Sequence, residues 1–330
     1  MTHKSRVLSG MRPTGKLHFG HYHGVLANWL KLQQDYECFF FVADWHALTT
    51  DYASPGGIKD NVREMVIDWL SVGIDPGVCT IFRQSSIAEH AELFVLLSMI
   101  TPLPWLERNP TYKEQLGEIK DKDLHTFGFL GYPVLQTADI IVYKADKVPV
   151  GIDQAPHVEL SREITRRFNN FYGPVFPEPA TLLTASPKML GTDGRKMSKS
   201  YNNAILLSDA PETIEKKMLQ MMTDTARMRR TDAGNPDLCP LFITFHAIYS
   251  DEKTVRWVRE GCTTAGIGCT ECKKSVIPKV LEMIAPVQKK RAELEADRAY
   301  IDSVLDRGAE VAREVAAATM AEVRKAMSLA

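Results

Sequence analysis

Two short segments of the sequence carry side chains that could bind a nucleotide. The first, His18-Phe19-Gly20-His21, follows an apolar strand pattern over residues 6–10 and a turn over residues 13–15. A strand, a tight turn and the beginning of a helix form a cradle for phosphate. Gly20 lets a base or ribose approach the backbone, and both imidazoles can donate hydrogen bonds to phosphate oxygens. Taken alone, the segment could also be a surface loop that happens to contain histidines.

The second segment, Lys196-Met197-Ser198-Lys199-Ser200, lies in a loop that also contains Gly191, Gly194 and Arg195. A mobile cationic loop suits a triphosphate. When the α-phosphorus is attacked, pyrophosphate leaves, and lysines can close on its negative charge as that charge develops. The alternative interpretation is an ordinary solvated basic loop. The two segments together predict an ATP site, with His18, His21, Lys196 and Lys199 as the catalytic residues.

In this order and at this separation, the two segments resemble the ATP-binding signatures of class I aminoacyl-tRNA synthetases. Four further stretches resemble the tryptophanyl-tRNA synthetase family, so the resemblance covers nearly the whole chain; they span residues 10–15, 44–49, 132–140 and 149–154. The resemblance implies a ligase that uses ATP with Mg²⁺ to activate L-tryptophan and then transfers it to tRNA(Trp). It also implies a homodimer.

The first part of the chain alternates between apolar strand patterns and helical periodicity. Strands are predicted over residues 38–43 and 79–82, and helices over residues 58–73 and 88–100. Such alternation indicates a parallel sheet with crossover helices, whose ligands bind beyond the carboxyl ends of the strands. With the resemblance, it predicts an α/β fold: a Rossmann-like, doubly wound catalytic domain over residues 1–200 and a smaller C-terminal α-helical domain over residues 201–330.

The junction between these domains is expected between residues 187 and 211, because the pattern is helical from Glu212 onward. Residues 309–326 are rich in alanine at helical spacing. Alanine is the strongest helix former, so this stretch predicts a packed terminal helix.

Asp139 is the candidate for recognising the amino-acid side chain. It precedes the apolar run 140–143, where a carboxylate must find a hydrogen-bond donor. An indole N–H would satisfy it, and so would a tyrosine hydroxyl. The resemblance implies that Asp139 binds the indole nitrogen and that Tyr132 and Gln154 hold the α-amino group of tryptophan.

Four other residues complete the predicted substrate sites. Gln136 stands in the indole-pocket stretch where many bacterial members of the family have methionine, and His46 is either a pocket wall or a satisfied core histidine. Arg12, in the first turn, can pair with a phosphate or a carboxylate. The resemblance implies that Asp153 accepts hydrogen bonds from the ribose hydroxyls of ATP. The full predicted ATP site is Arg12, His18, Gly20, His21, Asp153, Lys196, Met197, Ser198 and Lys199.

The six cysteines form two groups. Cys38 and Cys79 lie in apolar strand patterns and are expected to be buried small hydrophobic residues. The other four are separated by 22, 6 and 2 residues in a stretch rich in glycine and threonine; they are Cys239, Cys262, Cys269 and Cys272. Four thiolates could ligate a [4Fe–4S] cluster or zinc, or could remain unliganded or form a disulfide.

A similar cysteine spacing marks a bacterial subset of the family that carries [4Fe–4S], so the resemblance implies this cluster, with zinc as the alternative. The neighbouring Lys273 and Lys274 suggest that the cluster organises an RNA-contacting surface.

Composition limits the remaining possibilities. The net charge of −1 provides no overall attraction to nucleic acid, so contact with tRNA must use local basic patches, with candidates at residues 227–230, 273–279 and 289–291. No apolar run approaches the roughly 18 to 20 residues of a membrane helix. Sparse cysteines and the absence of an apolar signal stretch in residues 1–10 predict a soluble protein of the reducing cytoplasm.

Three rival interpretations remain at this point. A tyrosyl-tRNA synthetase shares the fold and both signatures. A non-catalytic RNA-binding paralogue is disfavoured because both histidines and both lysines are intact. An iron–sulfur redox protein is disfavoured because the sequence contains no second cofactor motif.

Overall fold

The computed structural model describes residues 4–118, 122–183 and 189–330, without the side chains of residues 115, 118 and 153. Five parallel strands form one sheet in the order β3-β2-β1-β4-β5. They are β1 (Arg6–Met11), β2 (Glu37–Val42), β3 (Cys79–Arg83), β4 (Lys147–Val150) and β5 (Ala180–Leu183). The order reverses between β1 and β4, which is where doubly wound sheets bind their ligands.

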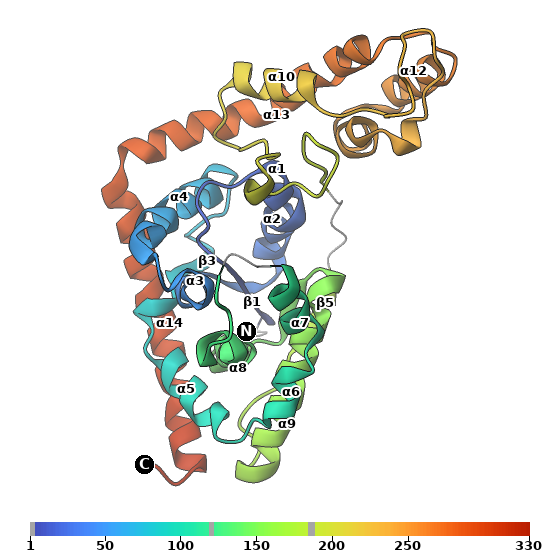
Figure 1. The fold of residues 1–330 in the computed structure, drawn as a ribbon. Coiled ribbons are helices and arrows are strands. Elements are labelled where there is room, and N and C mark those ends of the chain that lie inside the picture. The colour runs from blue at the N-terminus through green and yellow to red at the C-terminus, as the bar shows by residue number, and fades with distance from the viewer. Residues whose placement is uncertain (1–3, 119–121, 184–188) are drawn as a thin grey trace.

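Helices connect and cover these strands (Figure 1). The α-helices are α1 (Phe19–His21), α2 (Ala27–Asp35), α3 (Asp44–Asp51), α4 (Ile58–Ser71), α5 (Glu89–Ser98), α6 (Leu103–Glu107), α7 (Pro110–Glu118), α8 (Phe127–Val142), α9 (Ala155–Tyr172), α10 (Pro211–Gln220), α11 (Ala247–Tyr249), α12 (Glu252–Thr263), α13 (Cys269–Ala296) and α14 (Arg298–Ala326). Short 3₁₀ turns are η2 (Pro55–Gly57), η3 (Gln84–Ser86), η4 (Ile152–Gln154), η5 (Lys199–Tyr201) and η6 (Pro236–Leu238), and π turns are η1 (Tyr22–Leu26) and η7 (Phe242–His246).

Alternating residues of β2 supply two separate cores. Phe40 packs with the residues of α2 and α4, whereas Phe39 and Phe41 pack with those of α5, α8 and α9. Successive side chains of a strand point to opposite faces, so a strand buried on both sides reads as a continuous apolar run. The sequence pattern of β2 follows from this double burial, and the predicted α/β class with a Rossmann-like doubly wound sheet is confirmed.

The residues after the lysine loop form a mostly helical part, and its last helix packs against the sheet (Figure 1). Helix α13 passes α10 and α4, and α14 then runs back along α4, β3 and α5. Gly308 of α14 lies so close to β3 that a Cβ there would come within 1.8 Å of the Ile81 carbonyl oxygen. The expected terminal packed helix is therefore α14, and it packs on the catalytic part of the chain.

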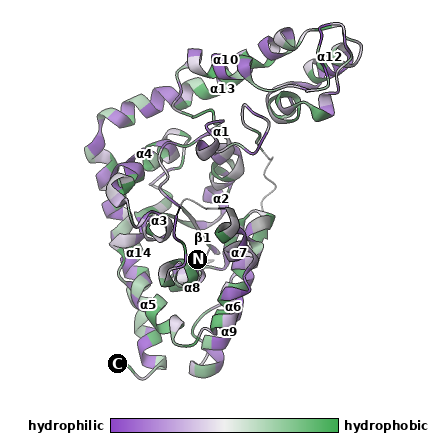
Figure 2. Cartoon of the chain, viewed as in Figure 1, coloured by the Kyte–Doolittle hydropathy of each residue, from purple (hydrophilic) through white to green (hydrophobic). Residues whose placement is uncertain are grey.

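Buried helices are mostly hydrophobic, and helices with a side toward solvent are mixed (Figure 2). Helix α8 lies in the centre and is mostly buried, with a run from Gly131 to Leu135 that is buried throughout. Helices α10 and α13 alternate hydrophilic and hydrophobic residues because one side of each faces solvent. No helix among the described residues is long and apolar enough to cross a membrane.

Residues 221–235 differ from the expected helical pattern, since they contain no helix. The Asp224 carboxylate instead accepts hydrogen bonds from the backbone N–H groups of Ala226 and Asn235 and holds this segment as a loop. The local bond to Ala226 is of the kind that competes with helix formation. The predicted boundary at residue 200 stays a prediction, and Pro187 lies outside the described residues.

Candidate functional site

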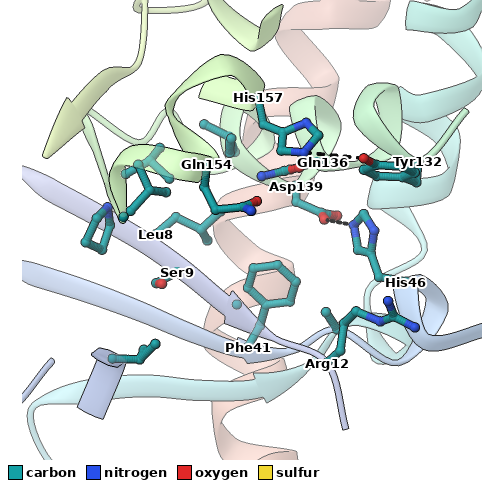
Figure 3. Close-up of a pocket in the computed structure, with 18 of the residues that line it drawn as sticks. Leu8, Ser9, Arg12, Phe41, His46, Tyr132, Gln136, Asp139, Gln154 and His157 are labelled. Atoms are coloured by element: carbon teal, nitrogen blue, oxygen red, sulfur yellow. Dashed lines mark hydrogen bonds and ion pairs between the residues drawn. The ribbon is translucent and has the colours of Figure 1, made fainter. Parts of the chain in front are cut away.

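A cavity of about 320 Å³ opens at the carboxyl ends of β1 and β4 (Figure 3). Its apolar wall includes Trp29, Phe41 and Phe129. Six of the predicted substrate residues line it: Arg12, His46, Tyr132, Gln136, Asp139 and Gln154. Residues distant in the sequence therefore meet at the point where the strand order reverses, as the fold class requires.

Gly10 gives this cavity its shape. A Cβ on Gly10 would lie within 2.4 Å of the Phe41 ring, so only glycine lets this ring lie across β1. Figure 3 shows Phe41 below the polar groups of Gln154 and Asp139. The ring provides a flat apolar surface on one side of the cavity, and the polar groups stand opposite.

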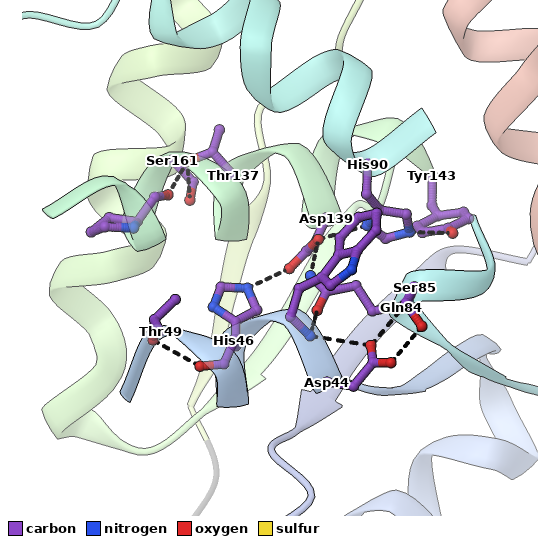
Figure 4. Close-up of polar contacts among 12 residues, drawn as sticks. Asp44, His46, Thr49, Gln84, Ser85, His90, Thr137, Asp139, Tyr143 and Ser161 are labelled. Atoms are coloured by element: carbon purple, nitrogen blue, oxygen red, sulfur yellow. Dashed lines mark hydrogen bonds and ion pairs between the residues drawn. The ribbon is translucent and has the colours of Figure 1, made fainter. Parts of the chain in front are cut away.

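Asp139 is the most buried polar group of the cavity, with 1% of its surface exposed. Its Oδ1 atom accepts hydrogen bonds from Gln84 Nε2 at 2.8 Å and His90 Nδ1 at 2.6 Å, and its Oδ2 atom bonds His46 Nε2 at 2.8 Å (Figure 4). Burial alone would raise the pKa of this carboxyl, but the bonds from His46 and His90 outweigh it and lower the pKa to about 2. Asp139 is thus a fixed anion, and Oδ2 retains a further lone pair.

Gln84 and His90 were not identified from the sequence. The His90 ring is fully buried between Asp139 and the Tyr143 hydroxyl, which lies 2.7 Å from His90 Nε2. Gln84 accepts the backbone N–H of Trp45 and thereby joins Asp139 to the beginning of α3 (Figure 4). No local sequence signal reveals these contacts, because they join segments about 50 residues apart.

His46 fits both alternatives considered for it, a residue of the pocket wall and a histidine with a satisfied hydrogen bond. It lines the cavity, and it is paired with Asp139. Tyr132 lies at the same end, with its hydroxyl 3.3 Å from His157 Nε2, and burial raises its pKa. Asn109 contacts the other ring nitrogen of His157 at 3.3 Å. His157 lines the cavity three residues after Gln154, and this spacing could have identified it.

The histidine signature forms a tight turn that does not itself line the cavity; Gly24 and Val25, a few residues later, do. The backbone N–H of His18 donates to His21 Nδ1 at 3.2 Å, which leaves the proton of a neutral His21 ring on Nε2, free to be donated. Burial, together with the nearby Lys199 and Lys196, lowers the pKa of His18 to about 4 and that of His21 well below its usual value. Both rings are therefore neutral donors at neutral pH. Gly20 accommodates the His18 ring, since a Cβ there would lie 2.9 Å from it.

The lysine signature, from a distant part of the chain, reaches the backbone just before this turn. Lys199 Nζ donates to the carbonyl oxygen of Lys16 at 3.0 Å and to that of Thr14. Burial lowers the pKa of Lys199, and the nearby Asp68 carboxylate opposes that shift. The predicted convergence of the two signatures is present in the structure.

Asn203 organises the lysine loop, although the sequence analysis did not select it. It is 1% exposed, its side-chain oxygen accepts the Ser198 N–H at 2.7 Å, and its amide donates to the Lys196 carbonyl at 3.2 Å. Met197 is buried under the loop, whereas Lys196 is exposed. The loop thus presents its lysines on a fixed backbone.

Asp153 belongs to the predicted ATP site, but its side chain lies outside the described residues. Its backbone is part of η4, at the edge of the cavity formed by Gly151 and Gln154.

The four spaced cysteines come together in the helical part of the chain. Arg227 Nη1 lies 3.9 Å from Cys262 Sγ and 4.0 Å from Cys269 Sγ. Burial and the three other thiols raise the pKa of Cys272 to about 12. Within the described ranges, no group of three or more His, Cys, Asp or Glu has an arrangement that could hold a metal ion.

The basic patches predicted from the sequence divide into structural and exposed cations. Lys273 is buried and donates to the carbonyl oxygens of Leu219 and Met221 at 2.7 and 2.6 Å. Arg291 is buried and paired with Asp68. These two residues therefore serve the fold, and the remaining exposed lysines and arginines are the ones available to a polyanion.

Comparison with known proteins gives consistent results. The family described as "tRNA synthetases class I (W and Y)" matches residues 1–285. A tryptophan--tRNA ligase of Thermotoga maritima is 54% identical over 98% of this chain and 99% of its own, and one from Aquifex aeolicus is 45% identical over 98% and 100%. The crystal structure of a tryptophanyl-tRNA synthetase from Campylobacter jejuni with ADP and tryptophan superposes with a TM-score of 0.88, 31% identity and coverage of 98% and 100%.

The lowered pKa of His18 predicts a specific loss of stability in acid. An unfolded histidine binds a proton near pH 6.5, but His18 in the folded chain resists it until about pH 4. The stabilisation is therefore complete above pH 6.5 and is lost as the pH falls toward 4, by at most about 3 kcal/mol for this residue. Urea unfolding at pH 7.5 and 5.0 should show a smaller decrease in His18→Gln than in the parent chain. Equal decreases would contradict the prediction.

Proposed function

This chain belongs to the class I tRNA synthetases for tryptophan and tyrosine and is a tryptophan–tRNA ligase, and from that premise we propose which of its residues carry out the reaction. The ligase activates L-tryptophan with ATP and transfers it to tRNA(Trp). The observation that carries the proposal is the convergence of both signatures beside a cavity that contains Asp139.

In the first step a carboxylate oxygen of tryptophan attacks the α-phosphorus of ATP. The bond to the β-phosphate oxygen breaks, giving tryptophanyl-adenylate and pyrophosphate, while Mg²⁺ compensates part of the phosphate charge. We assign His18, His21, Lys196 and Lys199 to the charge that develops on the phosphates. Neutral imidazoles that donate and lysines that are held close by suit electrostatic stabilisation, because they need little reorganisation during the reaction.

Tryptophan would lie in the cavity with its ring against Phe41. Three protein donors already occupy most of the Asp139 carboxylate, and the free lone pair of Oδ2 suits one indole N–H. Tyr132 and Gln154 would hold the α-amino group, with Gln136, His46 and Arg12 completing the wall. Asp153, Gly20, Met197 and Ser198 keep their proposed roles at ATP.

In the second step a hydroxyl of the terminal ribose of tRNA attacks the tryptophanyl carbonyl and AMP leaves. We propose that residues 201–330 contact the anticodon, as a domain distinct from residues 1–200. Exposed Lys253, Arg256 and Trp257 on α12 support this role, since unstacked bases bind to aromatic faces and cations.

We further propose a cytoplasmic homodimer. Large apolar side chains are exposed just after α5 and at the beginnings of α6 and α8, with Met99 73%, Phe127 68% and Leu103 56% exposed. Exposed apolar side chains of this size are typical of protein interfaces. All six cysteines are unpaired among the described residues, as in a reducing compartment.

For Cys239, Cys262, Cys269 and Cys272 we propose a [4Fe–4S] cluster, with zinc as the alternative. The support is that Arg227 lies within 4.0 Å of the sulfurs of both Cys262 and Cys269, which brings two of the four thiols to one side chain. The cluster would fix the fold of residues 262–272 at the beginning of α13 rather than carry out redox chemistry.

The amino-acid specificity is tested by ATP–pyrophosphate exchange with each of the twenty amino acids. Tryptophan should drive exchange, and tyrosine should be disfavoured because its hydroxyl does not occupy the position of the indole nitrogen. In Asp139→Asn the tryptophan-dependent exchange should fall more than tenfold. Exchange driven by tyrosine would identify the rival synthetase, and no exchange at all would favour a non-catalytic RNA-binding protein.

Lys199→Ala should slow single-turnover adenylate formation by about 100-fold, because it removes a cation from the developing pyrophosphate charge. Tryptophan affinity, measured by calorimetry, should change less than twofold. Lys289→Ala, on the exposed side of α13, is the matched lysine control. An unchanged adenylate rate in Lys199→Ala would remove this residue from the proposed role.

Anaerobically purified protein should be brown, absorb near ~400 nm and contain four irons per chain. Cys269→Ser should lose the colour and the iron, whereas Cys79→Ser, at a buried cysteine of the sheet, should keep both. One zinc per chain and no iron would overturn the cluster in favour of the alternative.

A further inference from the structure

A buried carboxylate holds the backbone immediately before the histidine signature. Asp68 lies on the inner side of α4 and is fully buried. Its Oδ2 atom accepts the backbone N–H of Leu17 at 2.7 Å. Since Leu17 directly precedes His18, the position of Asp68 determines where the signature begins.

Arg291 of α13 holds that carboxylate in turn. It is 3% exposed, and its two terminal nitrogens bond Asp68 and Glu64, with Glu295 at 2.9 Å. Residues 223 positions apart in the sequence thus meet in one ion pair. The pair connects the helix that begins at Cys269 with the turn that carries His18 and His21.

Stability alone does not account for this pair. Transfer of two charges from water to the interior is costly, and apolar residues of similar size stabilise a fold equally well or better. The ion pair instead fixes the Asp68 carboxylate in the orientation in which it accepts the Leu17 N–H. The carbonyl of Leu17 is held as well, since it accepts the Leu207 N–H at 2.9 Å.

The same helix supports that second contact. Gln288, one turn before Arg291, donates to the Asp209 carbonyl at 2.7 Å, beside the segment that pairs with Leu17. The Phe19 N–H donates to the Ile205 carbonyl at 3.1 Å, and His18 and Leu206 form an isolated antiparallel bridge. Helix α13 therefore supports both the N–H and the carbonyl of Leu17, the residue directly before the signature.

We infer that Asp68 and Arg291 are positioning residues for adenylate formation: their buried ion pair fixes the Leu17 N–H and, through it, the two signature imidazoles. This inference rests on the proposed role of His18 and His21 at ATP. The nearby Asp68 carboxylate also opposes the lowering of the Lys199 pKa by burial. A displacement of about 1 Å at a reacting group can cost about 100-fold in rate.

The double variant Asp68→Leu/Arg291→Met separates positioning from stability. It removes both buried charges together and so leaves neither of them unpaired; its melting temperature should fall only by the loss of the Leu17 N–H hydrogen bond, less than in Asp68→Leu alone. Its single-turnover adenylate rate should fall 10- to 100-fold and its KM for ATP should rise, while its calorimetric Kd for tryptophan stays within twofold. Asp68→Asn keeps an acceptor for Leu17 and should retain more than a tenth of the rate.

Arg63→Met is the matched control. Arg63 also joins α4 to the C-terminal helices, through Asp302 at 2.8 Å, but it makes no contact with Leu17 or Lys199 among the described residues, so its adenylate rate should not change. If the double variant does not fold, Arg291→Lys carries the test and should be several-fold slower with unchanged tryptophan affinity.

The inference would be overturned if the folded double variant, or Arg291→Lys in its place, formed adenylate at the parent rate. It would also be overturned if Arg63→Met lost as much of the adenylate rate as that variant. Tryptophan-dependent exchange in the parent chain is measured first. Its absence would refute the proposed function itself, whereas an active parent with an unaffected double variant refutes only the positioning role.

Discussion

The backbone of Leu17 is the point on which the nucleotide site depends. Its N–H is bound by a buried carboxylate and its carbonyl by the segment that follows the lysine loop. Neither hold is local in sequence, and each joins the histidine turn to a different part of the chain. Helix α13 supports both contacts of Leu17, through Arg291 and Gln288. The two signatures, far apart in the sequence, therefore share one structural support.

The base of the lysine loop is supported in a related way. Lys273, near the beginning of α13, holds the carbonyl of Met221, and the next residue, Met222, donates its N–H to the Thr192 carbonyl at 2.7 Å. Helix α13, which begins at Cys269, therefore supports the lysine loop indirectly near its beginning and the histidine turn indirectly near its end. Helix α13 thus links the backbone near both signatures through Lys273 and Arg291.

Sequence reasoning predicted the elements whose signal is local and did less well where contacts are distant. Strands 38–43 and 79–82 were recognisable because each is buried on both faces, and the signatures because their chemistry is contained in a few residues. Gln84, His90 and Asn203 escaped because an isolated polar residue gives no hint that it will be buried against a partner far away in sequence. Arg291 and Lys273 were counted as possible RNA contacts for the same reason, since a basic cluster does not reveal which of its members is buried.

The amino-acid site illustrates the same limit. Asp139 was predicted to need a donor, and the structure supplies three from the protein itself. A carboxylate held this firmly has a lowered pKa, and two of the three donors that hold it, Gln84 and His90, lie outside the motifs recognisable in the sequence.

Gly308 has a consequence for how this polypeptide is made. β3 is an outer strand of the sheet, and α14 lies against its backbone at Ile81. An uncovered outer strand offers free N–H and C=O groups to any passing chain and promotes aggregation. During synthesis the sheet emerges from the ribosome more than a hundred residues before the helix that shields it. The nascent protein therefore exposes the aggregation-prone edge of β3 until α14 has been synthesised. Helix α14 thus protects this edge from pairing with other chains.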